Sequence, residues 1–318
     1  MNQKVSIIGL GVMGQRMLGN MHNYAGFDAV TAWDPDQEAC ERTVAGYPGL
    51  EIAADASAAI GHPDTSVVYI ASPPVAHSAH ARAAFDAGKA VYCEKPLGVD
   101  LSDSESLVAA AADSGLVNIV NFSLASATAT REIERLMAAG ALGEIVAADV
   151  RIHFATWPRA WQMAAASWLS YRAEGGFTRE VLSHWIYLSE RLLGPLSLDS
   201  HSARYPGGNL SETHLHAMLF AGETPVSVAA SSGGIGPDLV EYTLWGSKRS
   251  CRIVDWNRLF TSDGDDWRPE LTTIADHREA GYELQLQNAA RATAGEDHSM
   301  PTFADALAVQ RLIEAMLI

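Results

Sequence analysis

Hydrophobic residues in the first 120 positions fall into two alternating patterns. Short continuous runs rich in Val, Ile and Ala predict strands that are buried on both faces, as in a parallel sheet. Longer stretches with apolar residues at every third or fourth position predict amphipathic helices. The expected strands span residues 5–8, 29–33, 66–71, 90–93 and 117–120, and the expected helices span 15–21, 76–87 and 101–114. Strands and helices that alternate in this way predict a mostly parallel, doubly wound sheet.

The pattern changes after Asn121, because strands then follow one another without helices between them. A helix is expected over 130–139 and a half-buried strand over 145–154. Further strands are expected over 196–204, 214–220, 225–231, 239–245 and 249–254, and a last amphipathic helix over 303–317. Consecutive strands joined by short turns are typical of an antiparallel sheet. We therefore expect an α/β protein: a doubly wound parallel domain over 1–121, and a second α/β domain over 122–318 with a large open, mostly antiparallel sheet.

Composition and charge narrow the classes of partner. Of the 318 residues 48% are hydrophobic and 19% are charged, which is the balance of a packed globular protein. A formal net charge of -16 argues against a nucleic-acid partner, because phosphate binding needs clustered Lys and Arg. No apolar stretch approaches the roughly 20 residues of a membrane span, and three cysteines without metal-ligand spacing indicate a reducing compartment. We expect a cytoplasmic protein with no nucleic-acid partner, no membrane partner and no metal.

The turn after the first strand carries a glycine pattern typical of dinucleotide binding. Residues 9–14 read G-x-G-x-x-G between a strand and a helix. Such a turn brings backbone N–H groups and a helix N-terminus close to a pyrophosphate. Asp34 ends the second strand, where an acid can accept the hydroxyls of an adenine ribose and repel a 2′-phosphate. We expect a Rossmann domain that prefers NAD to NADP, with a first set of cofactor residues made of Gly9, Gly11, Val12, Met13, Gly14 and Asp34.

Two further motifs follow expected strands at the edge where ligands of doubly wound sheets bind. The first reads Ser72-Pro73-Pro74-x-x-His77, and the second reads Glu94-Lys95-Pro96. Together with the glycine turn, in this order and spacing, they resemble the Gfo/Idh/MocA oxidoreductase family. The similarity continues through residues 140–145, 175–184 and 301–316. β-Hydroxy-acid dehydrogenases share the opening glycine pattern, but their second domain is helical, and the strands expected here argue against them.

The resemblance implies hydride transfer between a nicotinamide and a carbinol or carbonyl carbon of a small, cyclic or sugar-like substrate. His184 would accept the hydroxyl proton, because imidazole titrates near neutral pH. Lys95 would bind the same oxygen and stabilise its developing negative charge. Glu180 precedes His184 by one helical turn, at a position where family members commonly carry Asp, and we expect it to orient the histidine. A second set of cofactor residues follows from the resemblance: Ser72, Pro73, His77, Glu94 and Lys95.

The segment from 157 to 180 is rich in Trp and Arg and supplies candidates for substrate contact. Indole rings suit the C–H face of a ring compound, although here they could simply cover the sheet. Guanidinium groups suit a carboxylate, although here they could be ion-paired at the surface. The residues expected to contact the substrate are Lys95, Trp157, Arg159, Trp161, Arg179 and His184. His214 and His216 share one face of a strand without a third ligand, which favours exposed histidines over a metal site.

Two alternatives remain open for the function, and one expectation concerns assembly. The substrate could be an imine or a keto compound, since no motif specifies hydroxyl binding. The protein could also be a non-catalytic NAD(H)-binding redox sensor, although a sensor would not need both Lys95 and His184. An uncovered apolar sheet face is unfavourable in a monomer, so we expect a homodimer or homotetramer that associates through the open sheet.

Overall fold

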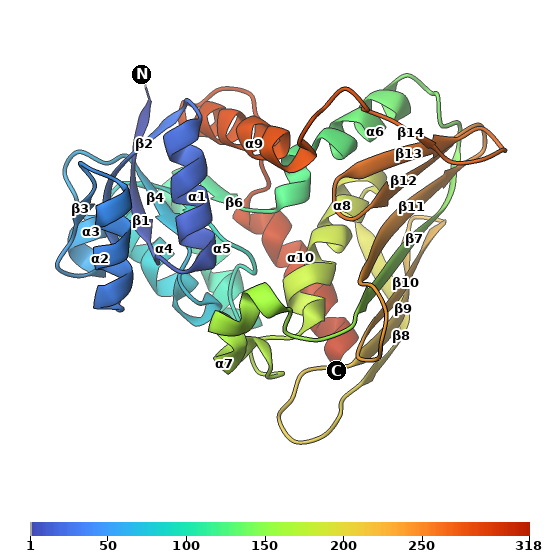
Figure 1. The fold of residues 1–318 in the computed structure, drawn as a ribbon, viewed down its shortest axis with the longest axis horizontal. Coiled ribbons are helices and arrows are strands. Elements are labelled where there is room, and N and C mark those ends of the chain that lie inside the picture. Colours follow the sequence, from blue (N-terminus) through green and yellow to red (C-terminus); the bar gives the residue numbers. More distant parts are fainter. Residues whose placement is uncertain (1) are drawn as a thin grey trace. The chain divides into compact units, whose positions relative to one another are not determined.

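The computed structural model describes residues 2–318, which form two compact units (Figure 1). The first unit contains the chain up to Phe122 together with Tyr282–Leu307, and the second contains Ser123–Gly281 and Ala308–Ile318. The chain passes from the first unit to the second after Phe122, one residue from the boundary expected from the sequence. Its return to the first unit at Tyr282 was not expected. The reason is a helix, α9 (His277–Thr293), whose residues Leu286, Ala289 and Ala292 are buried in the hydrophobic core of the first unit.

The first unit is built on a six-stranded sheet with the order β3-β2-β1-β4-β5-β6. All of its strand pairs are parallel, which confirms the doubly wound parallel sheet. Its strands are β1 (Gln3–Ile8), β2 (Phe27–Trp33), β3 (Glu51–Ile52), β4 (Val67–Ile70), β5 (Ala90–Cys93) and β6 (Asn118–Val120). Its helices are α1 (Val12–Asn23), α2 (Gln37–Gly46), α3 (Ala56–Ile60), the short 3-10 turn η1 (Pro74–Ala76), α4 (His77–Asp86) and α5 (Leu101–Ser114).

The second unit is built on an eight-stranded sheet with the order β14-β13-β12-β11-β7-β10-β9-β8. Only β7 and β10 run parallel; the other neighbouring strands are antiparallel, as expected. Its strands are β7 (Ile145–Phe154), β8 (Leu196–Arg204), β9 (His214–Ala221), β10 (Thr224–Ser232), β11 (Leu239–Gly246), β12 (Ser250–Val254), β13 (Arg258–Ser262) and β14 (Arg268–Pro269). The helical segments that lie wholly in this unit are η2 (Ser123–Ser126), α6 (Thr128–Ala138), η3 (Ala160–Ala165), α7 (Ala166–Leu169), the π-helical turn η4 (Thr178–Leu182) and α8 (Ser183–Leu193). Helix α9 begins in this unit and continues into the first, and α10 (Phe303–Leu317) begins in the first unit and ends in this one.

One face of the eight-stranded sheet, called the inner face here, is covered by α8. Alternate residues of β7 point to this side and are buried, as the half-buried pattern predicts. Trp185 of α8 stacks on Tyr242 of β11 with ring centroids 5.8 Å apart and an interplanar angle of 20°. Both side chains are fully buried. This packing fixes the helix that carries His184 against the sheet.

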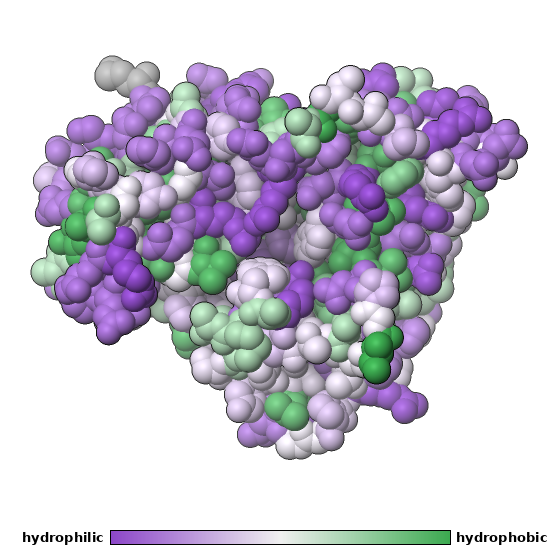
Figure 2. Space-filling view, in the orientation of Figure 1, coloured by the Kyte–Doolittle hydropathy of each residue, from purple (hydrophilic) through white to green (hydrophobic). Residues whose placement is uncertain are grey.

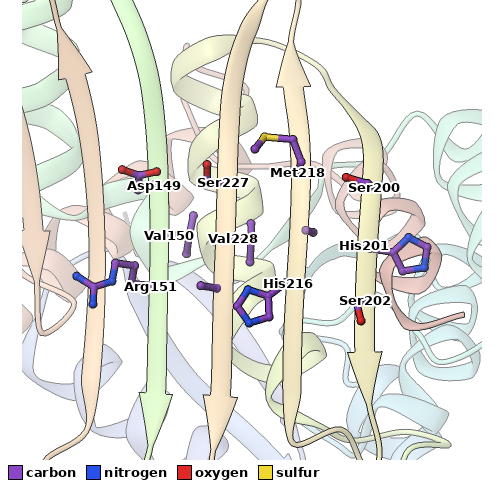
Figure 3. A pocket seen from close by; sticks show the side chains of 12 residues that line it. Asp149, Val150, Arg151, Ser200, His201, Ser202, His216, Met218, Ser227 and Val228 are labelled. Carbon is purple, nitrogen blue, oxygen red and sulfur yellow. The ribbon is translucent and has the colours of Figure 1, made fainter.

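The other face of this sheet, called the outer face, is more polar than expected. Asp149 and Arg151 of β7 lie on it. Nε1 of Trp245 donates to Asp149 Oδ2 at 2.6 Å, and Arg151 pairs with Glu241 at 3.6 Å. A groove of about 630 Å³ runs over β7, β10, β9 and β8 (Figure 3). Asp149 and Arg151 line it together with serine, histidine and methionine side chains. The outer face therefore combines apolar side chains with polar and charged ones, as an antiparallel sheet with one solvated face commonly does. The expected association through this face stays a prediction.

Hydrophilic side chains cover most of the surface seen in Figure 2, and hydrophobic residues gather there in small patches. This surface agrees with the formal net charge of -16. Among residues 2–318, no helix has both the length and the apolar character that a membrane crossing needs.

Candidate functional site

The glycine turn between β1 and α1 leaves room only for glycine at two positions. Gly9 has a φ of +98°, and a Cβ there would lie 2.6 Å from the backbone of Ala71. A Cβ on Gly14 would lie 1.9 Å from the carbonyl oxygen of Gly9. At Gly11 a Cβ would meet no protein atom within 4 Å. Helix α1 starts directly after Gly11 at Val12 without a side-chain cap or an acidic residue in its first turn, so its N–H groups suit an anion such as a pyrophosphate.

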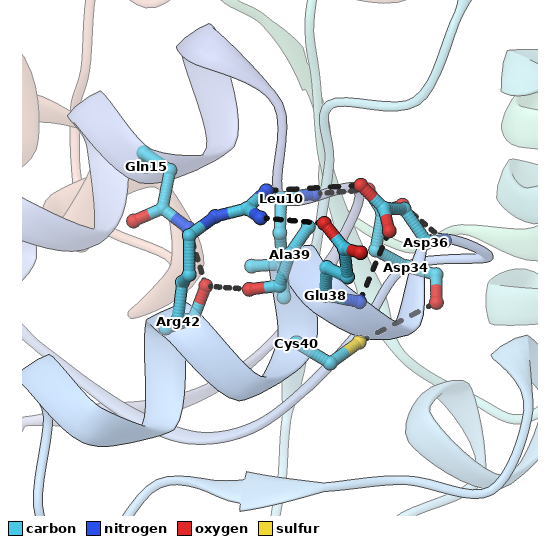
Figure 4. Close-up of polar contacts among 9 residues, drawn as sticks. Leu10, Gln15, Asp34, Asp36, Glu38, Ala39, Cys40 and Arg42 are labelled. Carbon is cyan, nitrogen blue, oxygen red and sulfur yellow. Dashed lines mark hydrogen bonds and ion pairs between the residues drawn. The ribbon is translucent and has the colours of Figure 1, made fainter.

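Asp34, at the end of β2, holds this turn in place (Figure 4). Its Oδ2 accepts a hydrogen bond from the backbone N–H of Leu10 at 2.7 Å, and its Oδ1 accepts one from Asp36 at 2.8 Å. A carboxylate offers about four acceptor positions. The other two acceptor positions of Asp34 suit hydroxyl donors, such as the hydroxyl groups of a ribose.

Arg42 of α2, the first basic residue after Asp34 in the chain, brings a positive charge close to this strand end. Its guanidinium lies 3.7 Å from Asp36 Oδ2 and 3.4 Å from Glu38 Oε2 (Figure 4). The side chain is 65% exposed, so these pairs are screened by solvent. Asp34 and the two partners of Arg42 still leave an excess of negative charge around this strand end.

His77, at the start of α4, connects the two proline motifs of the first unit. Its Nδ1 lies 2.8 Å from the carbonyl oxygen of Pro96, and its Nε2 lies 2.8 Å from that of Ser72. Burial lowers the pKa of His77 to about 4, although both carbonyl contacts favour the charged ring. A neutral imidazole can donate only one of these hydrogen bonds. The described contacts of His77 thus tie the loop after β4 to the Lys95-Pro96 segment, and its contact with the cofactor stays a prediction.

The carboxylate of Glu94 lies in a buried network at the end of β5. Its Oε1 accepts hydrogen bonds from the hydroxyl of Tyr69 and from Nδ2 of Asn121, the latter at 2.6 Å. Oδ1 of Asn121 accepts in turn from the hydroxyl of Tyr92 at 3.2 Å and from Nε2 of Gln285. Burial raises the pKa of both tyrosines well above its ordinary value, so both remain donors at neutral pH. The network joins β4, β5, the end of β6 and α9.

Lys95 follows this fixed carboxylate directly and is half-buried. Its backbone is continuous with the Pro96 carbonyl that His77 contacts. The glycine turn, Asp34, the loop after β4 and Lys95 therefore all lie at the carboxyl ends of β1, β2, β4 and β5. This is the edge at which doubly wound sheets bind ligands.

In the second unit, the segment with Glu180 and His184 is not a regular α-helix. The backbone N–H of Ser183 donates to the carbonyl of Thr178, five residues earlier, which defines the π-helical turn η4. Such turns occur often at functional sites because they shift side chains relative to the following helix. The sequence predicts regular α-helical spacing between Glu180 and His184, and the structure differs from this in the register of its backbone hydrogen bonds.

Glu212, between β8 and β9, is a buried acid that no motif in the sequence indicates. Its Oε1 accepts the backbone N–H of Thr178 at 2.7 Å, at the start of η4. Gly176 has a φ of +101°, and a Cβ there would lie 2.3 Å from Glu212 Oε2. Burial raises the pKa of Glu212. The acid and the glycine together fix the beginning of the segment that carries Glu180 and His184.

His184 is 7% exposed and packs against the turn between β12 and β13. Its ring centroid lies 5.4 Å from that of Trp256, with an interplanar angle of 84°. Glu180 accepts a hydrogen bond from Nε2 of Gln162 at 3.2 Å, and Oε1 of Gln162 accepts one from Nε of Arg159 at 2.9 Å. A buried amide thus links the carboxylate of Glu180 to a guanidinium, and neither Gln162 nor Trp256 was expected from the sequence.

The candidates for substrate contact differ in how far their side chains are already engaged. Arg179 is 11% exposed at its side chain and donates to both carboxylate oxygens of Glu314, at 2.6 and 2.7 Å, and to two backbone carbonyls. The guanidinium carbon of Arg159 lies 4.8 Å from the ring centroid of Phe154 and 4.8 Å from that of Trp161. Trp161 is 46% exposed, whereas Nε1 of Trp157 donates to a backbone carbonyl at 3.1 Å. These contacts weigh against Arg179 as a ligand for a substrate carboxylate.

His214 and His216 both lie exposed on β9. Within residues 2–318, no group of three or more His, Cys, Asp or Glu side chains is placed to hold a metal ion.

Two sequence profiles match this chain over most of its length. Residues 3–122 match an oxidoreductase family with an NAD-binding Rossmann fold, and residues 134–317 match the C-terminal alpha/beta domain of the same family. The chain belongs to the Gfo/Idh/MocA oxidoreductase family. The family assignment and the two-domain fold expected from the sequence are thus confirmed.

Named members of the Gfo/Idh/MocA family resemble parts of the chain. It is 34% identical to inositol 2-dehydrogenase 3 of Saccharopolyspora erythraea over 172 residues, which is 52% of this chain and 50% of that protein. It is 38% identical to 1,5-anhydro-D-fructose reductase of Ensifer adhaerens over 91 residues, which is 29% of this chain and 27% of that protein. The matched part therefore spans half or less of these relatives.

A solved NAD-binding oxidoreductase from Klebsiella pneumoniae has the same fold along its length. The two superpose with a TM-score of 0.83 at 21% identity, covering 100% of this chain and 97% of that one. At this identity the likeness concerns the fold of this Gfo/Idh/MocA protein alone.

Proposed function

We propose that this protein is an NAD(P)-dependent oxidoreductase that transfers a hydride between the nicotinamide and a carbinol or carbonyl carbon of a small ring-shaped, sugar-like compound. The observation that carries the proposal is Lys95. It stands at the ligand-binding edge of an NAD-type Rossmann sheet, directly after a carboxylate fixed by Tyr69 and Asn121. The names of the relatives, an inositol dehydrogenase and an anhydrofructose reductase, support a ring-shaped substrate.

The residues of the first unit suit a dinucleotide. The backbone N–H groups at the start of α1, including those of Val12 and Met13, would bind the pyrophosphate, and Asp34 would accept ribose hydroxyls. Ser72, Pro73, His77 and Glu94 would support the cofactor from the loop after β4 and the end of β5. When bound, the nicotinamide ring supplies or accepts the hydride.

The residues of the chain would handle the proton and the charge on the substrate oxygen. Nζ of Lys95 would donate a hydrogen bond to that oxygen and stabilise its negative charge as the C–H bond breaks. A ring nitrogen of His184 would accept the hydroxyl proton during oxidation and return it during reduction. Glu180, held by Gln162, would orient the histidine. Loss of a proton to His184 and of a hydride from carbon leaves a carbonyl product, so atoms and electrons balance.

We further propose that the site prefers NAD to NADP. Asp34 and the acids that pair with Arg42 would repel a 2′-phosphate. We expect NAD(H) to bind at least about tenfold more tightly than NADP(H), which is about 1.4 kcal/mol. Calorimetry with both cofactors measures this, and Asp34→Ser should narrow the difference. Equal affinities in the unchanged protein would contradict the preference.

The contacts of the arginines favour a neutral substrate. Both carboxylate oxygens of Glu314 already pair with Arg179. Arg159 packs on aromatic rings and remains a candidate for a weaker polar contact, together with the exposed face of Trp161. A neutral polyol with one apolar C–H face fits this surface better than a carboxylate does.

A substrate screen followed by NADH absorbance tests the proposed function. The panel contains myo-inositol, other inositols, anhydrosugars and hexoses with NAD⁺, and keto acids and imines with NADH. We expect turnover with at least one ring-shaped polyol. Turnover confined to imines or keto acids would favour the alternative reductase, and tight NADH binding without any turnover would favour a redox sensor.

We also propose that two or four copies associate through the outer face of the eight-stranded sheet. The open groove over β7 to β10 offers a broad surface, and its mixed polarity is compatible with a second copy. Sedimentation analysis of the protein and of Arg151→Glu tests this. A monomer at micromolar concentration, or a variant that associates unchanged, would contradict it.

A further inference from the structure

We propose that Trp256 is a positioning residue that fixes the orientation and the proton affinity of the His184 imidazole. The inference rests on the proposed role of His184 as proton acceptor, and its test does not require turnover. Trp256 belongs to the three-residue connection between β12 and β13, more than seventy positions after His184 in the chain.

The indole of Trp256 contacts two consecutive residues of α8. It meets the ring of His184 at an interplanar angle of 84°, and the ring of Trp185 at a centroid distance of 5.5 Å and an angle of 42°. Trp185 is itself buried and stacked on Tyr242 of the sheet. The His184 ring therefore packs between its own helix and the indole of Trp256, which in turn packs on the buried Trp185.

The indole is carried by a hairpin connection whose backbone has an uncommon conformation for a bulky residue. Asp255 has a φ of 51° and Trp256 has a φ of 74°, which is the left-handed region that bulky residues rarely adopt. The connection is fastened by a hydrogen bond from the N–H of Asp255 to the carbonyl of Val240 at 3.0 Å. An ion pair between Asp255 and Arg258 at 2.8 Å fastens it further. An observed outlier of this kind is grounds for a functional hypothesis.

The edge-on arrangement has a physical consequence for the imidazole. Aromatic rings attract one another when the positive edge of one meets the negative face of the other, so rotation of the histidine ring about its Cβ–Cγ bond would lose this contact. The charged groups on the surrounding elements are Glu180 of η4, Asp255 of the connection and Arg258 of β13. Asp255 and Arg258 form an ion pair with each other. Removal of the indole should therefore change both the mobility of the imidazole and the energy of its protonated form.

The test uses Trp256→Leu, with Trp256→Phe as the conservative variant. The matched control is Trp245→Leu, which removes the same side chain from the outer face of the same sheet, where it bonds to Asp149. The proteins are labelled with ¹³C-histidine, and the Cε1–H resonance of His184 is identified by its absence in His184→Gln. The resonance is then followed as a function of pH.

We expect Trp256→Leu to move the His184 resonance and to shift its titration midpoint by about 0.4 pH unit or more, which corresponds to the lower end of aromatic pair energies. Trp256→Phe should move the resonance in the same direction by a smaller amount, and Trp245→Leu should leave it unchanged. A resonance and midpoint in folded Trp256→Leu that equal those of the control would overturn the proposal.

If Trp256→Leu does not fold, Trp256→Phe decides the question, and an unchanged resonance there would also overturn the proposal. Should the expected shifts appear while no substrate is turned over, the positioning role stands and the proposed function fails. The two outcomes are thus distinguishable.

Discussion

Lys95 and His184, the two groups to which we assign the chemistry, are held by different interactions. The residue before Lys95 is a carboxylate bound by a hydroxyl and an amide in a network that extends through Asn121 to α9. His184 lies edge-on against the indole ring of Trp256, a residue whose backbone has a left-handed φ of 74°. The first arrangement fixes direction through hydrogen bonds, and the second fixes it through packing and shape.

The two arrangements should respond differently to substitution. A buried polar network is stable when every member has its partner and is costly when one member is lost. An aromatic contact is worth less in stability, so its loss changes the orientation of a ring more than it unfolds a domain. We therefore expect variants near Lys95 to affect stability as well as activity, and variants near His184 to affect activity first.

The largest effect is expected from Lys95→Ala. Removal of a donor that stabilises charge on the substrate oxygen should reduce turnover by about 10² or more. NADH binding should persist, because the glycine turn and Asp34 remain intact. Steady-state rates and NADH fluorescence titrations measure the two effects, with the exposed Lys248→Ala as control. Near-normal turnover in Lys95→Ala would remove this residue from the mechanism.

A smaller effect, mainly on stability, is expected from Asn121→Leu. The substitution removes one of the buried hydrogen bonds to the carboxylate of Glu94, which keeps the Tyr69 hydroxyl, and it removes the acceptor of the Tyr92 hydroxyl and of the Gln285 amide. We expect these losses to cost about 3 kcal/mol of unfolding free energy. Urea unfolding measures this, and the exposed Asn209→Leu is the control. Equal stability of the two variants would show that the network does not hold the Lys95 segment, and the contrast with His184 would disappear.

The smallest effect concerns acid stability and His77. Its folded pKa of about 4 lies below the ordinary value of 6.5, so the unfolded chain takes up the proton first as the pH falls. Stability should therefore decrease between about pH 6.5 and pH 4, by about 2 kcal/mol from pH 7 to pH 5. His77→Gln should remove this part of the acid sensitivity in urea unfolding at the two pH values. An equal loss in both proteins would mean that His77 is protonated in the folded state, as its two carbonyl contacts favour.

Much of the fold could be predicted from local pattern, because its strands are continuous or alternating apolar runs. The bounds expected for β5, α5 and β7 coincide with those observed. The two-residue strands β3 and β14 are too short for any periodicity to appear. The return of the chain to the first unit escaped prediction because α9 is only weakly amphipathic and its destination depends on tertiary packing.

The candidate site likewise contains residues that local sequence patterns predict and residues that only the tertiary structure reveals. Motifs at strand ends, such as the glycine turn and Glu94-Lys95-Pro96, were visible because position along a strand fixes position in the sheet. The partners of these motifs were not visible, since Gln285 and Asn121 are 164 residues apart in the chain. Glu212 and Trp256 reach the His184 segment from separate connections between strands, and no local spacing relates them to it.

The most direct test of the chemistry is the pH dependence of kcat/KM for oxidation of the polyol found in the screen, measured for the protein and for His184→Gln. A neutral imidazole accepts a proton and a protonated one cannot, so the rate of the unchanged protein should fall at low pH with a one-proton slope. His184→Gln should bind NADH normally, lose about 10² or more in rate and lack this slope. A variant that keeps both the rate and the slope would contradict the assignment of His184 as the proton acceptor.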